Sequence, residues 1–193
     1  MSDLNDAIAE TYRSLRTLFD DLNRLGRDCS QALREEGLEL PEIQEYSYSP
    51  NTLTLKKSHA WFFSRAMEVG ADAKPTKLLF FSCFVYFEAD QGRWKLGKPG
   101  SPELWFFLGT VSPPPSTNWA SQIQTFFDHS EEGNYNAARQ LGGTVVDYSY
   151  KGPESQWDVS ILGHELAAID SATALKEKAV GPLVAAARRT IIP

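Results

Sequence analysis

Several residue types that carry chemistry are scarce in this chain. Its 193 residues include only two cysteines, Cys29 and Cys83, and three widely separated histidines. Two cysteines do not make a disulfide scaffold, so we expect both to be small buried residues of a protein from a reducing compartment. The histidine spacing matches no metal-binding motif, and neither glycine cluster, 97–100 or 142–143, matches a phosphate-binding loop. We therefore expect no metal site and no cofactor.

Long hydrophobic runs and a basic surface are also missing. The longest apolar run, residues 78–87, is about half of the ~20 residues that a membrane span needs. Acidic residues stand at the N-terminus, where a signal peptide would be basic, so we expect a cytoplasmic protein without a membrane segment. The net charge of −6 argues against general nucleic-acid binding, which needs a basic surface. Residues 51–100 carry eight basic and four acidic residues, which leaves a local anion site open.

What the chain does contain is one long amphipathic helix, predicted for residues 3–36 and ended by Gly37. Its length corresponds to roughly 50 Å, which is long for one domain. The apolar stripe either lies across the chain's own sheet or pairs with a partner subunit, and both hold if one end packs internally and the other pairs. The interface candidates are apolar residues at heptad spacing: Ile8, Leu15, Leu18, Leu22 and Leu25.

Aromatic and β-branched runs predict strands in the rest of the chain. The predicted strands are residues 77–89, a short return strand at 93–96, 103–111, 144–150 and 157–169. Residues 58–69 are ambiguous between helix and strand. The first of these strands shows no alternation of polar and apolar residues, so we expect its sheet to be buried on both faces.

Two further helices complete the predicted fold. One runs from Trp119 to about His129 and continues over residues 134–141 after a break at Gly133. The last starts at Asp170 or Ser171, runs to about Arg189 and is interrupted at Gly181-Pro182. The order of elements predicts a single α+β domain over residues 1–193. Its mainly antiparallel sheet of about five to six strands is covered by the long N-terminal helix, the middle helix and the C-terminal helix.

One end of the predicted sheet groups charged residues that could act on a phosphate ligand. Glu88 and Asp90 end the aromatic strand, and Arg93 and Lys95 begin the return strand. Carboxylates that hold a divalent ion near a basic residue are typical of metal-dependent nucleases. The Asp/Glu-x-Lys triplet of such sites is absent here, and the same charges can simply pair across a hairpin.

A small-ligand site is a further alternative. A tryptophan beside basic residues can stack on a base, a sugar or a peptide, and the ligand-binding candidates are Trp94, Trp61 and His59. Since no catalytic constellation assembles in the sequence, we expect a non-catalytic protein–protein interaction or scaffold module that forms a homodimer. The alternatives are a phosphate-ligand enzyme using Glu88 to Lys95 and a small-ligand sensor domain.

Overall fold

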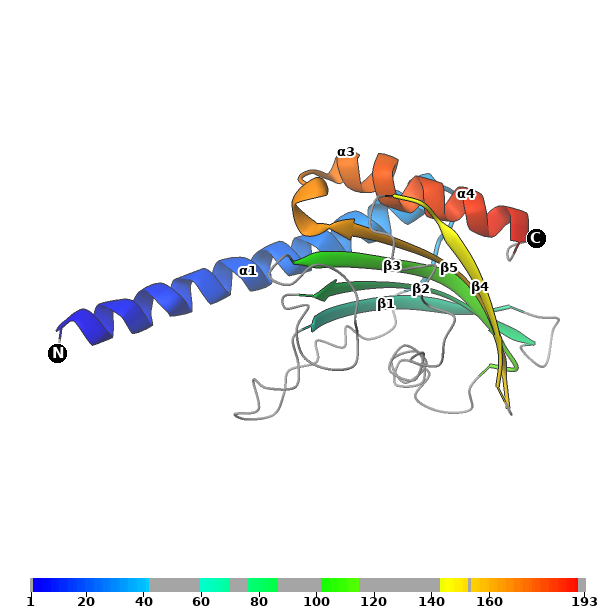
Figure 1. The fold of residues 1–193 in the computed structure, drawn as a ribbon, viewed down its shortest axis with the longest axis horizontal. Helices are drawn as coiled ribbons and strands as arrows, with labels where there is room; N and C mark the ends of the chain where they lie inside the picture. Colours follow the sequence, from blue (N-terminus) through cyan, green and yellow to red (C-terminus); the bar gives the residue numbers. More distant parts are fainter. Residues whose placement is uncertain are drawn as a thin grey trace.

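The computed structural model describes residues 2–41, 60–69, 76–86, 102–114, 143–152 and 154–190. Figure 1 shows a curved sheet with helices over one face and one long helix that extends beyond it. The elements are helix α1 (Ser2–Glu35), strands β1 (Ala60–Val69), β2 (Lys77–Tyr86), β3 (Glu103–Ser112), β4 (Val146–Lys151) and β5 (Gln156–Glu165), the 3-10 turn η1 (Leu166–Ala168), helix α3 (Ala172–Leu175), the π-helical turn η2 (Lys176–Val180) and helix α4 (Gly181–Thr190).

The five strands form one antiparallel sheet in the order β1-β2-β3-β5-β4. The predicted α+β class with an antiparallel sheet is therefore confirmed. Residues 60–69, which the sequence left ambiguous, form a strand paired with β2 along its whole length. Strands β2 and β3 pair directly, with Phe81 opposite Leu108. A meander with a return strand between them is therefore wrong, and residues 93–96 lie outside the described residues.

Both faces of the central strands β2 and β3 are buried, as the missing alternation predicted. Side chains of one strand alternate between the two faces, so Phe80 and Phe81 point in opposite directions, and both are 0% exposed. All but the last residue of β3 are buried as well. On the helix-covered face Phe81 packs in the main hydrophobic core, whereas Phe80 on the other face meets the Trp157 ring edge-on.

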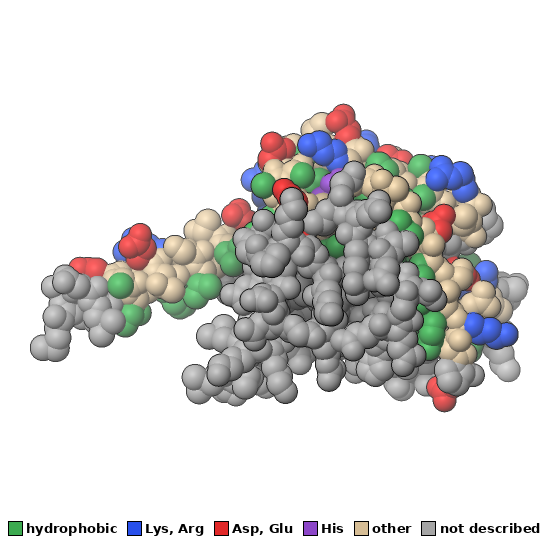
Figure 2. Space-filling view, viewed as in Figure 1, with side chains coloured by type: hydrophobic (Ala, Val, Ile, Leu, Met, Phe, Trp, Pro, Cys, Tyr) green, Lys and Arg blue, Asp and Glu red, His purple; other side chains and the backbone are tan. Residues whose placement is uncertain are grey.

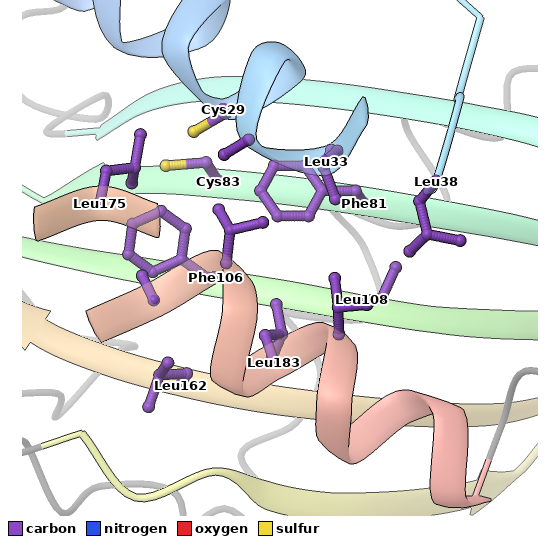
Figure 3. Close-up of a cluster of buried hydrophobic side chains, with 14 of the residues drawn as sticks. Cys29, Leu33, Leu38, Phe81, Cys83, Phe106, Leu108, Leu162, Leu175 and Leu183 are labelled. Carbon is purple, nitrogen blue, oxygen red and sulfur yellow. The ribbon is translucent and has the colours of Figure 1, made fainter. Parts of the chain in front are cut away.

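The second half of α1 and the C-terminal helices lie over the same face of the sheet (Figure 1). Figure 3 shows how their apolar side chains meet those of the strands: Leu33 of α1 and Leu183 of α4 point toward Phe81 and Phe106. All four side chains are at most 1% exposed. The N-terminal and C-terminal helices thus cover the sheet as predicted, and the predicted middle helix, residues 119–141, lies outside the described residues.

The end of α1 is set by Gly37. Its backbone has φ +76°, a left-handed conformation that glycine adopts without strain. The Leu38 amide donates to the Leu33 carbonyl and the Gly37 amide donates to the Arg34 carbonyl, both at 2.9 Å. This is a Schellman motif, and its usual apolar contact is present because Leu33 and Leu38 both belong to the core. The predicted helix end is confirmed.

The last helical region contains the interruption that the sequence predicted at Gly181-Pro182. Ser171 caps the first turn by accepting a hydrogen bond from the Ala174 amide at 3.1 Å. The π-helical turn η2 stands directly before Gly181, whose amide donates to the Lys176 carbonyl five residues back. Since proline has no amide hydrogen and crowds the preceding turn, a widened turn accommodates Pro182 without ending the helical path.

Candidate protein interface on helix α1

Helix α1 has two halves with different surroundings. Figure 1 shows its C-terminal half lying over the sheet and its N-terminal half extending past the sheet into solvent. We call residues 2–17 the projecting segment and residues 22–35 the anchored segment. At 1.5 Å per residue the projecting segment is about 24 Å long.

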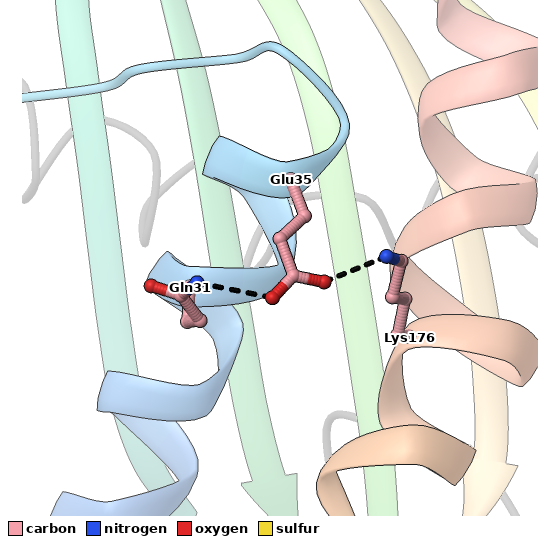
Figure 4. Close-up of polar contacts among 3 residues, drawn as sticks. All are labelled: Gln31, Glu35 and Lys176. Atoms are coloured by element: carbon pink, nitrogen blue, oxygen red, sulfur yellow. Dashed lines mark hydrogen bonds and ion pairs between the residues drawn. The ribbon is translucent and has the colours of Figure 1, made fainter.

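The anchored segment is fixed by both apolar and polar contacts. Leu22, Cys29 and Leu33 are buried in the core. Near its end, Lys176 of η2 donates to Glu35 at 2.6 Å, and Gln31 donates to the other Glu35 carboxylate oxygen at 3.0 Å (Figure 4). The core contacts and the Lys176 contact hold α1 in one direction relative to the body of the molecule, and therefore fix where the projecting segment points.

The same polar contacts shift the titration of both charged groups. The hydrogen bond from Lys176, followed by the one from Gln31, lowers the pKa of Glu35 below its ordinary value. The hydrogen bond to Glu35 raises the pKa of Lys176. Both side chains are about 40% exposed, so solvent screens the pair. Its structural effect is to orient the helix end rather than to supply much stability.

The projecting segment presents large apolar side chains to solvent. Ile8 is 58% exposed, Tyr12 72% and Leu15 47%. Ile8, Thr11 and Leu15 share one face because they recur at three- and four-residue spacing, and Tyr12 flanks it. The Thr11 hydroxyl donates to the Ala7 carbonyl at 2.8 Å, so its polar atom already has a partner and its methyl group remains for packing. We call this face, from Ile8 to Leu15, the docking face.

Charged residues of the projecting segment avoid the docking face. With 100° of rotation per residue, Asp6, Glu10 and Arg13 point about 130° or more away from the centre of the docking face, and Arg16 points about 107° away. Figure 2 shows the same division, with apolar side chains along one side of the projecting helix and acidic and basic ones along the other. An exposed apolar face without charge, bordered by charged faces, is typical of a surface that becomes buried in an assembly.

The structure divides the interface candidates that the sequence indicated. Ile8 and Leu15 are exposed on the docking face, whereas Leu22 is only 5% exposed and belongs to the chain's own core. Leu18 and Leu25 are partly buried and pack against that core. Leu22 therefore leaves the set of candidate interface residues, and Leu18 marks the boundary.

Tyr12 is exposed beside the docking face, but it is not among the interface candidates that the sequence indicated. The sequence pattern shows it only as a widening of the apolar stripe, one position beside Thr11. Its 72% exposure depends on where α1 extends beyond the body of the molecule, and the sequence alone does not give this. A large aromatic side chain at this flank adds contact area to the docking face.

The other sequence candidates fall largely outside the described residues. This applies to the phosphate-ligand candidates Glu88, Asp90, Arg93 and Lys95, and to the ligand candidates Trp94 and His59. Trp61 lies on β1, in register with Val85 of β2.

Two buried polar side chains lie at one end of the sheet. Glu103 is 1% exposed and accepts a hydrogen bond from the Trp105 indole at 3.1 Å. His164 is 7% exposed, and its Nε2 donates to the Lys178 carbonyl at 2.9 Å. His164 lies opposite Leu104 in the β3–β5 register, so it points to the helix-covered face, and Glu103 points to the other face. The two side chains therefore cannot act together in one site.

No group of three or more histidine, cysteine or acidic side chains capable of holding a metal ion occurs in the described part of the chain. Among these same residues, no helix is both long enough and apolar enough to cross a membrane.

Cys29 and Cys83 are free thiols with 0% exposure, as predicted. Burial, with a smaller contribution from the neighbouring Cys29, raises the pKa of the Cys83 thiol well above its ordinary value. A thiol in this setting is not a nucleophile at neutral pH.

No protein-family model, curated protein or solved structure matches this chain.

Proposed function

We propose that this protein is a non-catalytic interaction module that forms a homodimer through the docking face of α1. The observation that supports this proposal is the position of Ile8, Tyr12 and Leu15 on a helix segment that extends beyond the body of the molecule. The same apolar stripe closes over the core farther along the helix. A rigid support therefore presents these exposed side chains in a fixed direction, which lowers the entropy lost on association.

The chemistry of the docking face favours a second copy of the chain as its partner. A two-fold interface places one surface against an identical one, so the surface must be complementary to itself. A charged face would meet its own charge, whereas the docking face carries apolar side chains and a threonine whose hydroxyl is already bonded. Charged residues at the back of the helix keep the free monomer hydrated.

Sedimentation velocity over a range of protein concentrations tests this proposal. Ile8→Glu places a charge in the centre of the docking face, and because Ile8 lies outside the core the variant should fold normally. We expect the wild type to shift from monomer to dimer as its concentration rises, and Ile8→Glu to remain monomeric.

Ala9→Glu is the matched control. It adds the same charge at the next residue, but on an exposed position about 100° farther around the helix and away from the docking face. We expect Ala9→Glu to dimerise like the wild type. If both glutamate variants dimerise as the wild type does, or if the wild type is monomeric throughout, the proposal is wrong.

A further inference from the structure

We infer that the two copies of α1 pair antiparallel, in the register that places Ile8 beside the partner's Thr11. This inference rests on the proposed homodimer and adds its geometry. It follows from three properties of the described residues: where the apolar stripe becomes covered, how heptad positions pair, and how charge changes along the helix.

The burial of the stripe beyond Leu18 excludes a parallel pair. The docking face and the buried face of the anchored segment are one continuous stripe, from Ile8 through Leu15 to Leu22. A parallel partner helix lying against Ile8 and Leu15 would continue along that stripe past Leu18. There it would run into the chain's own body, because the face of the stripe at Leu22 is already buried in the core. An antiparallel partner helix instead continues past the N-terminal end of α1. The body of the partner molecule then lies beyond the first turn of α1, where it meets no part of the first molecule's body.

The extent of the free stripe selects the register. Antiparallel helices pair one heptad column with the other, so Ile8 meets Leu4, Thr11 or Leu18 of the partner. Pairing with Leu4 would place Leu15 beyond the first residues of the partner helix and leave it exposed. Pairing with Leu18 would bring the partner's first turns to the height of Leu22, where the stripe is covered. When Ile8 pairs with Thr11, the partner helix contacts only the exposed part of the stripe. Leu15 then lies beside residue 4 of the other copy. The two-fold axis then passes between Ala9 and Glu10.

Charge along the helix agrees with this arrangement. The first part of the projecting segment is acidic, with Asp3, Asp6 and Glu10, and the next part is basic, with Arg13 and Arg16. In the inferred register Asp6 lies at the height of Arg13 of the other copy, whereas a parallel pair would align like charges. Asp6 and Arg13 point away from the partner helix, and salt screens charges that lie so far apart. This charge pattern therefore adds little affinity and only a small preference for the antiparallel orientation.

Cysteine crosslinking with a short bis-maleimide tests the orientation. Ile8→Cys reports the dimer in either orientation, because the two Ile8 positions are only about 4.5 Å apart along the inferred antiparallel pair. Leu15→Cys and Leu4→Cys report orientation. In the antiparallel pair, each of these residues lies about 16 Å along the helix axis from the same residue of the partner. Residue 15 of one copy instead lies beside residue 4 of the other. Wild type is the control, since Cys29 and Cys83 are fully buried.

We expect Ile8→Cys to crosslink to itself, and Leu4→Cys and Leu15→Cys to crosslink several-fold more when mixed than when either is alone. Efficient crosslinking of Leu15→Cys alone, with no gain on mixing, would show a parallel pair and overturn the inferred geometry while leaving the homodimer intact. If Ile8→Cys fails to crosslink and the wild type also sediments as a monomer, the homodimer itself is refuted.

Discussion

Leu15 and Leu22 lie seven residues apart on the same stripe of α1, yet replacing each with alanine should affect different equilibria. Leu22 is 5% exposed within the core, so Leu22→Ala should lower the free energy of unfolding by about 2–5 kcal/mol. Leu15 is 47% exposed and lies on the docking face, so Leu15→Ala should change the stability of the monomer by no more than about 0.5 kcal/mol.

The cost of Leu15→Ala should appear in the dimer instead. Complete burial of a leucine side chain is worth about 1.5–3 kcal/mol, so burying the exposed half of Leu15 contributes about 1 kcal/mol per copy. A symmetric dimer loses this twice, about 2 kcal/mol, which weakens the dimer Kd by about 30-fold.

Two measurements separate these effects. Urea unfolding, followed by tryptophan fluorescence at a concentration where the chain is monomeric, gives the free energy of unfolding. Sedimentation equilibrium gives the dimer Kd. If Leu15→Ala destabilises the monomer as much as Leu22→Ala does, the projecting segment packs on its own body and the reasoning fails. An unchanged Kd for Leu15→Ala would equally refute the docking face.

Three further predictions concern the body of the protein. Gly163→Ala should lower the free energy of unfolding by about 1–3 kcal/mol in urea unfolding, because a Cβ at this position would lie 2.7 Å from the buried Trp105 ring; a change below about 0.5 kcal/mol would contradict this contact. Lys176→Met should reduce the free energy of unfolding only slightly at neutral pH, because solvent screens the pair. This difference from wild type should shrink as Glu35 becomes protonated below its ordinary pKa of 4.5, and again as Lys176 loses its proton above its ordinary pKa of 10.5. A difference that stays constant from pH 3 to pH 7 would argue against the Glu35 contact. Cys83 should react with a thiol reagent only on unfolding, and rapid labelling of the native protein would contradict its burial.

The sequence predicts the elements of this fold well where local chemistry decides them. The heptad spacing of α1, the glycine at position 37 and the cap at Ser171 each specify a local conformation, and the structure has all three. The unbroken apolar character of residues 78–87 predicts a strand buried on both faces, because no side of it suits water.

Properties that depend on distant parts of the chain were harder to predict. Residues 60–69 mix aromatic residues with helix formers, and only pairing with β2 makes them a strand. Likewise, Ile8, Leu15 and Leu22 follow one spacing and look equivalent in the sequence. The body of the molecule buries Leu22 and leaves Leu15 exposed, and this difference divides one stripe into a core segment and a docking face.

The molar mass of the wild-type protein in solution, measured by light scattering from low to high micromolar concentration, tests the homodimer most directly. A monomer has a mass of 21.6 kDa. We predict a mass that rises toward twice this value as the concentration increases and returns to the monomer value on dilution. A mass that stays at 21.6 kDa at high micromolar concentration would contradict self-association through α1.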